Sequence, residues 1–455
     1  MGKNEMLVSF LGTLFSPAGK RGALSILIFH RVLARPDPIF PDEPDAQRFD
    51  ALLSWIGEAF NVMPLDRAVA ALVEGRLPAR AAAITFDDGY ADNYTVALPI
   101  LQKHRMNATF FVATDFLDGG RMWNDTVIEA VRGYEGETLD LTHLGLGRFE
   151  IRTPEERRNA IQSLLPAIKY LPAVERSAQV TAIGEVTRRP LPDDLMMTSD
   201  QLRALRAAGM VIGGHTCSHP ILARIDDDAA YREIADGKQR LEHILSEPVS
   251  LFAFPNGKPG KDYEAKHVRM VRDAGYRAAV STSVGAARRD TDVFQLPRFT
   301  PWDRTSLRFG LRLVDNMRVR GSSPHEGAAH HLPSRGGGAA LAVSSTAARA
   351  AVPLSDGSDG MTCHYYAANS MLAWRQSGGD WADAAGARSE DHPMRSRWFR
   401  PPRHCRGSSS TSRRWPTIGR SARRPRCPLP PRSPGRQIGH RQFSEPRARE
   451  RHGAS

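Results

Sequence analysis

The chain has 455 residues, which allows two or three average domains or one large barrel with additional segments. Its formal net charge of +12 does not indicate a nucleic-acid-binding protein, because the excess lies at one end. Residues 1–325 hold 41 basic and 41 acidic side chains, whereas residues 326–455 hold 21 and 9. No run of about 18 apolar residues predicts a transmembrane helix, and the four cysteines form no CxxC pair that would indicate a structural zinc site.

Residues 1–21 are expected to form a short leader. An apolar stretch at residues 7–19 follows Lys3, but Ser9 and Gly12 interrupt it, which favours an amphipathic leader over a signal peptide. We therefore expect a cytoplasmic protein, with export and association with a membrane surface as open alternatives.

From residue 22 to about residue 318, short apolar runs alternate with longer stretches in which apolar residues recur at helical spacing. This alternation predicts a parallel α/β architecture, and in a barrel of this kind active residues gather at the C-terminal ends of the strands. The expected strands are residues 23–30, 81–86, 108–113, 211–213, 249–255 and 277–282. The expected helices lie within residues 45–60, 61–77, 91–106, 197–210, 227–246 and 264–276.

Two segments do not follow this pattern. Residues 118–196 do not fit one strand–helix unit and predict an inserted, mostly helical elaboration, with one helix begun by the capping pattern TPEE at residues 153–156. Residues 319–455 are rich in Gly, Ser, Pro and Arg, and this composition predicts a disordered tail. An arginine-rich arm that binds anions and a read-through or out-of-frame product are the alternatives for the tail.

Two adjacent carboxylates follow one of the expected strands. The stretch AAAITFDDGYADNY at residues 81–94 places Asp87 and Asp88 after a buried run, where each charge loses water and repels the other. An isolated DDG sequence is usually a solvated corner between a strand and a turn, in which an aspartate caps a helix. A bound cation offers a different reason, because it would compensate one carboxylate and leave the other able to accept a proton.

Two histidines offer further donors for such a cation. His215 and His219 in GGHTCSHP (residues 213–220) are four positions apart and directly follow an expected strand. Two imidazoles at this spacing converge on one ion if the segment turns helically, although isolated HxxxH pairs are mostly structural. Two histidines and one carboxylate form a donor set for zinc or iron that leaves coordination positions open.

The motifs TFDDGY (residues 85–90) and HTCSH (residues 215–219) together resemble the polysaccharide deacetylase superfamily, carbohydrate esterase family 4, with the NodB-homology fold. The resemblance covers residues 22–318. It implies a distorted barrel of seven β/α units that removes N-acetyl groups from amino-sugar polymers with the help of a metal ion.

The resemblance also implies roles for individual residues. Asp87 is implied as the general base, and Asp88, His215 and His219 as the ligands of a divalent metal ion. We expect zinc, and the same donor set accepts cobalt, nickel or manganese.

Two features depart from the family pattern. The usual C-terminal L-x-x-H motif is absent after residue 267, but LIFH at residues 27–30 resembles the relocated motif of permuted members, so we expect His30 as the general acid. The alternative is a histidine that caps a strand. The R-x-P-Y segment appears only as FAFPNG at residues 252–257, and we expect Arg298 to orient the base in place of the missing arginine. A surface salt bridge is the alternative for Arg298.

The predicted function is therefore metal-dependent N-deacetylation of an amino-sugar polymer or oligomer in envelope or exopolysaccharide metabolism, with Trp123 and Trp302 as candidates to stack on a sugar ring. Neither a nucleic-acid partner nor a particular oligomeric state is predicted. One alternative is an amidohydrolase of the same fold that acts on a small non-sugar substrate. Another is a non-catalytic protein that binds a polyanion through its arginine-rich tail, in a salt-sensitive and metal-independent manner.

Overall fold

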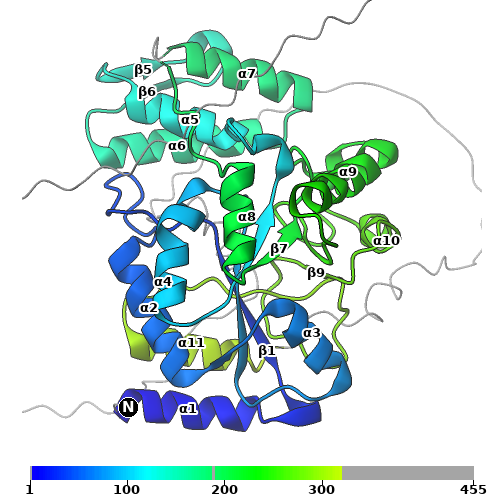
Figure 1. Cartoon of the computed structure of the whole chain (residues 1–455). Coiled ribbons are helices and arrows are strands. Elements are labelled where there is room, and N and C mark those ends of the chain that lie inside the picture. The colour runs from blue at the N-terminus through cyan, green and yellow to red at the C-terminus, as the bar shows by residue number, and fades with distance from the viewer. Residues whose placement is uncertain (1–2, 187–189, 320–455) are drawn as a thin grey trace, which may run out of the picture. The chain divides into compact units, whose positions relative to one another are not determined.

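The computed structural model describes residues 3–186 and 190–319, in which a curled sheet of parallel strands forms the centre (Figure 1). The strand order is β1-β3-β4-β7-β8-β9, and β2 pairs with β3 outside this path. This architecture confirms the predicted fold class, an α/β protein with a distorted barrel of parallel strands. The strands of the sheet are β1 (Leu24–Phe29), β2 (Asn61–Val62), β3 (Ala81–Phe86), β4 (Thr109–Val112), β7 (Val211–Gly214), β8 (Leu251–Ala253) and β9 (Ala278–Val280).

Residues 296–299 join the two edges of this sheet. The backbone N–H of Phe299 donates to the carbonyl of Ile26 in β1 at 2.7 Å. At the other edge, the N–H of Ser281, which follows β9, donates to the carbonyl of Leu296 at 2.8 Å. Both contacts are parallel bridges. This short segment therefore acts as a seventh strand that closes the barrel. Residues 296–299 are not among the strands that the sequence predicts.

Helices pack around the sheet and cover its strands. Every residue of β1, β3 and β4 is buried, as expected for parallel strands with packed elements on both faces. A capping box of Thr198 and Gln201 begins α8. The helices outside the insertion are α1 (Lys3–Phe15), α2 (Ala46–Ala59), α3 (Leu65–Glu74), α4 (Leu98–Lys103), α8 (Ser199–Ala207), α9 (Asp227–Leu245), α10 (Ala265–Asp273) and α11 (Ser306–Asn316).

The segment between β4 and β7 forms a mostly helical insertion with its own hydrophobic cluster, seen at the top of Figure 1. The predicted capping box of Thr153 and Glu156 begins α6. An antiparallel hairpin accompanies the expected helices, and the boundaries at residues 118 and 196 stay a prediction. The elements of the insertion are α5 (Trp123–Gly133), β5 (Thr138–Asp140), β6 (Arg148–Glu150), α6 (Pro154–Lys169) and α7 (Ala173–Val186).

The N-terminal helix α1 packs against α11 and α2, and the Val8 side chain is buried in this contact. Most of the expected leader, residues 1–21, therefore lies against the barrel. Among the helices of the described residues, none combines the length and the apolar character that crossing a membrane requires. The expected disordered tail lies outside the described residues from position 320 onward.

A substitution in β7 tests how tightly the barrel packs around this strand. A Cβ atom at Gly213 would lie 2.4 Å from Cδ1 of Phe111 and 2.9 Å from the carbonyl of Leu251. We expect Gly213→Ala to lower the free energy of unfolding by about 1–3 kcal/mol because the core must shift to admit the methyl group. Urea denaturation measures this change. The control, Gly133→Ala, places a methyl group where nothing lies within 4 Å, and equal midpoints for the two variants would contradict the packing described.

Candidate active site

The paired aspartates stand at the C-terminal end of β3, where the chain turns sharply. The N–H of Asp87 still donates to the carbonyl of Phe29 at 3.0 Å, so Asp87 continues the pairing of β3 with β1. Asp88 then adopts a left-handed conformation with φ of 76°, followed by Gly89 with φ of 93°. Both aspartates are buried, with 3% and 4% of their surfaces exposed. This turn sends two adjacent carboxylates toward different partners.

The histidine loop that follows β7 is similarly constrained. Thr216 and His219 have positive φ values of 67° and 56°, which are uncommon for residues with a side chain and rare for a β-branched one. The Glu233 carboxylate, on α9, accepts hydrogen bonds from the N–H groups of Cys217 and Ser218 at 2.9 and 2.8 Å. Sequence reasoning missed Glu233, because only the packing of α9 against the loop brings it there.

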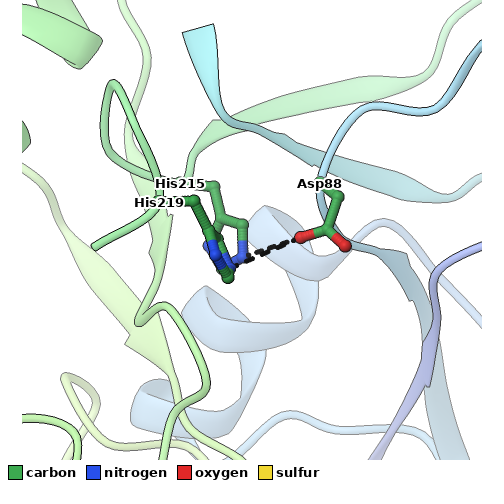
Figure 2. Close-up of side chains that lie close together, drawn as sticks. All are labelled: Asp88, His215 and His219. Carbon is green, nitrogen blue, oxygen red and sulfur yellow. Dashed lines mark ion pairs between the residues drawn. The ribbon is translucent and has the colours of Figure 1, made fainter. Parts of the chain in front are cut away.

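Asp88, His215 and His219 converge on one point (Figure 2). Oδ1 of Asp88 lies 3.4 Å from Nε2 of His215 and 3.5 Å from Nε2 of His219. Ligand bonds of about 2.0–2.1 Å at tetrahedral angles place ligand atoms roughly 3.3–3.4 Å apart, so these separations fit a zinc-like cation. Nδ1 of His215 lies 2.7 Å from the carbonyl of Ala253 and can only donate to it, which leaves Nε2 as the atom available to a cation.

The protonation states of the histidines agree with this geometry. Burial lowers the pKa of His219 to about 3, which keeps the imidazole neutral as a metal ligand requires. Burial also lowers the pKa of His215, but the hydrogen bond to Asp88 and the charges of Asp87 and Asp88 outweigh burial and raise it. These carboxylates thus favour a positive charge at the position that a cation would take.

Asp87 has a different partner. Arg298 donates two parallel hydrogen bonds to Asp87, from Nη1 to Oδ1 and from Nη2 to Oδ2, each 2.7 Å long. Nε of Arg298 donates to the carbonyl of Ser281 at 2.9 Å, and both members of the pair are buried. Burial raises the pKa of Asp87, but the charges of Arg298, His215 and His30 and the hydrogen bonds from Arg298 together outweigh it and hold the pKa below its usual value. Asp87 is therefore an ionised carboxylate held in a fixed orientation beside the donor set.

His30 follows β1 and lines the same pocket as the two aspartates and two histidines. Its backbone carbonyl accepts a hydrogen bond from Nδ2 of Asn93 at 2.8 Å. Burial lowers the pKa of its imidazole, and the charges of Asp88 and Asp87 oppose this effect. The structure thus brings together all of the predicted catalytic and metal-binding residues, although they lie in four separate segments of the sequence.

Residues 74–279 match the family model described as polysaccharide deacetylase. The chain carries a polysaccharide deacetylase domain. The matched residues include both motifs of the predicted resemblance, and the match confirms the predicted family and enzyme class, a hydrolase of non-peptide carbon–nitrogen bonds. It does not favour the small-amide or polyanion-binding alternatives. His30 and Arg298 lie outside the matched residues, so their roles and the permutation stay predictions.

Individual proteins similar to this deacetylase come from several bacteria. YxkH of Bacillus subtilis (strain 168), named a putative polysaccharide deacetylase, is 21% identical over 281 residues, which cover 61% of this chain and 71% of YxkH. The solved structure of Streptococcus pyogenes deacetylase PplD with acetate has 20% identity and a TM-score of 0.42, covering 64% of this chain and 98% of PplD. IcaB from Ammonifex degensii has 17% identity and a TM-score of 0.41, covering 67% and 99%.

Other residues around the deacetylase pocket show where sequence reasoning succeeded in part. Trp123 lines the pocket. Asn256, which belongs to the divergent FAFPNG segment, also lines it. Trp302 is absent from the pocket lining, and its ring lies 3.8 Å beneath the guanidinium of Arg312. Lys169 and Arg176 of the insertion also line the pocket, and no local pattern in the sequence indicates this.

Removal of the Arg298 guanidinium tests whether it compensates Asp87. We expect Arg298→Met to lower the free energy of unfolding by about 3–5 kcal/mol, because it leaves a buried carboxylate unpaired. The double variant Arg298→Met/Asp87→Asn removes that charge and is expected to recover much of the loss. Urea denaturation of the double-mutant cycle measures the coupling. Arg304→Met, which loses an exposed pair with Asp42, is the control. Additive effects of the two substitutions would contradict the interaction.

Proposed function

We propose that this protein is a metal-dependent N-deacetylase that acts on an N-acetylated amino-sugar polymer or oligomer. The observation that carries the proposal is the separation of the two buried aspartates. Asp87 is bound by Arg298, whereas Asp88 faces the Nε2 atoms of His215 and His219. One site thus combines a carboxylate placed to bind a metal ion with a second, ionised carboxylate that can accept a proton.

Asp88, His215 and His219 would hold the divalent cation, which we expect to be zinc. When bound, the cation would supply positive charge that favours ionisation of water and polarises an acetamide carbonyl. Asp87 accepts the proton of the attacking water, and Arg298 keeps the carboxylate ionised and fixed in orientation.

His30 is the proposed general acid. Its imidazole enters the pocket from β1, whereas Asp87 enters from the neighbouring strand β3. Cleavage of the amide needs a proton on the departing nitrogen, and His30, which lines the pocket beside Asp87 and Asp88, is placed to deliver it. Proton acceptance and proton donation are thereby assigned to different residues of one pocket.

Acetate release from N-acetylglucosamine oligomers tests the proposal. We expect chelation to abolish release and a divalent cation, tried as zinc, cobalt, nickel or manganese, to restore it. Asp87→Asn and His30→Ala are each expected to lower kcat by about 10²–10⁴-fold, since each removes a proton-transfer group. Asp200→Asn and His143→Ala change exposed residues of the same types and are expected to retain activity.

Robust release after chelation, or unchanged activity in Asp87→Asn, would contradict the mechanism. Full activity in His30→Ala alone would contradict only the assignment of the general acid. Acetate release by chelator-treated wild type sets the baseline against which the activity of each variant is compared. The urea denaturation midpoint of each variant shows separately whether the substitution impairs folding.

A further inference from the structure

A group of cations surrounds Tyr170, at the end of α6 in the insertion. Nζ of Lys261 lies 4.9 Å from the centroid of the Tyr170 ring, Nζ of Lys169 lies 5.6 Å from it, and Cζ of Arg224 lies 5.7 Å from it. Arg176 on α7 donates from Nη1 to the carbonyl of Lys169 at 3.3 Å. We call Lys169, Arg176, Arg224 and Lys261 the Tyr170 cation cluster.

The Tyr170 cation cluster reaches the catalytic pocket. Lys169 and Arg176 line this pocket together with Asp88 and His219. Lys169 is 9% exposed, and its charge contributes to the lowered pKa of His219, which places the ammonium in the electrostatic environment of the metal ligands. Two of the four residues of the cluster, Lys169 and Arg176, thus form part of the pocket wall.

The cluster also continues into a neighbouring hollow. Tyr170, Arg176, Ile221 and Arg224 line this second hollow, and Arg176 and Ile221 line the catalytic pocket as well. A chain of sugar units with one acetamide at Asp88 would therefore pass the cluster where it leaves the pocket.

Like charges gather around Tyr170. Burial lowers the pKa of Lys169 to about 8, with Asp262 opposing this effect and the neighbouring cations Lys258 and Lys261 adding to it. Among the residues that the structure describes, neither Arg224 nor Lys261 has a carboxylate within 4.0 Å of its side-chain nitrogens. Positive potential at the mouth of a pocket attracts an anion.

Three acidic residues, Asp115, Glu233 and Asp236, also line the second hollow. Asp115 pairs with Arg240 at 3.3 Å. The Glu233 carboxylate accepts the N–H groups of Cys217 and Ser218. Four arginines, Arg176, Arg224, Arg232 and Arg240, line the same hollow and outnumber these carboxylates.

We propose that the Tyr170 cation cluster is a subsite for an anionic group, carried by a sugar unit adjacent to the one whose acetamide enters the pocket. The substrate would then be an acidic amino-sugar polymer, with its charge on a carboxylate or a phosphate. Guanidinium groups bind both oxyanions in bidentate fashion, and ammonium groups add charge. The inference rests on the proposed function for the identity of the pocket, but not for the presence of the anion subsite.

Equilibrium binding to the chelator-treated full-length protein tests the subsite without catalysis. The probes are a neutral N-acetylglucosamine oligomer, an oligomer of equal length that alternates N-acetylglucosamine with glucuronate, and a neutral oligomer that carries one phosphate. We expect an acidic oligomer to bind about tenfold more tightly than the neutral one at low salt, with the advantage shrinking as sodium chloride screens the charges. The comparison of uronate and phosphate identifies which oxyanion the subsite prefers.

The variant Arg224→Gln/Lys261→Gln is expected to lose this advantage and to bind the neutral oligomer as wild type does. The matched control Lys20→Gln/Arg289→Gln also removes two exposed cations, but far from Tyr170 in the sequence, and is expected to keep the preference. Urea denaturation confirms that both variants fold.

Equal affinity for acidic and neutral oligomers, or a salt-sensitive preference that survives in Arg224→Gln/Lys261→Gln, would overturn the inference. Equal kcat/KM for acidic and neutral oligomers in the metal-loaded enzyme would do the same and would leave the deacetylase proposal intact. Absence of acetate release from all oligomers, with the binding preference present, would contradict the proposed function and support the anion subsite.

Discussion

Two neighbouring carboxylates buried at the end of one strand impose the constraint on which the site depends. Each loses its hydration, and each would repel the other unless opposite charge lies close to both. The fold meets this demand in two independent ways. Arg298 binds Asp87 through both carboxylate oxygens, whereas Asp88 is turned toward His215 and His219, where a cation fits.

The same constraint explains the unusual backbone at this edge of the barrel. Asp88, Thr216, His219 and Asn256 all have positive φ values, and they come from loops after three different strands. Such conformations persist only where surrounding contacts hold them, and they concentrate at functional sites. The hydrogen bonds that Cys217 and Ser218 of the histidine loop donate to the Glu233 carboxylate are such contacts.

Closure of the barrel and orientation of Asp87 are linked. Arg298 belongs to the segment 296–299 that joins β9 to β1, so the hydrogen bonds that close the sheet also carry the guanidinium to Asp87. The N–H of Arg298 donates to the carbonyl of Ser283 at 2.9 Å, which fixes this backbone further. A change in the closing segment would therefore reach the catalytic pocket without altering a metal ligand.

Sequence reasoning recovered the parts of the fold whose signal is local. Buried parallel strands are continuous apolar runs, and capping boxes lie within four residues, so β1, β3 and the start of α8 were predictable. The closing segment was not, because its bonds connect residues 296–299 to strands far away in the sequence. The three-residue strands of the β5–β6 hairpin are likewise too short to produce a periodic pattern.

The site divides in the same way. The aspartate and histidine motifs were recognisable together because their chemistry makes sense as one donor set, and Arg298 was expected from the absence of the usual arginine. Glu233, Lys169 and Arg176 were not recognisable, because charged residues on helices have the same appearance in sequence whether they face solvent or a pocket. Tertiary packing alone gives these three their positions.

The central claim is that Asp88 holds the cation whereas Asp87 moves the proton. Calorimetric titration of zinc into chelator-treated Asp87→Asn and Asp88→Asn proteins tests it most directly. The account predicts that Asp87→Asn binds zinc with an affinity close to that of wild type. It predicts that Asp88→Asn loses more affinity than the roughly 10–100-fold that loss of an outer partner costs. Near-wild-type zinc binding by Asp88→Asn, together with loss of binding by Asp87→Asn, would contradict this division of roles.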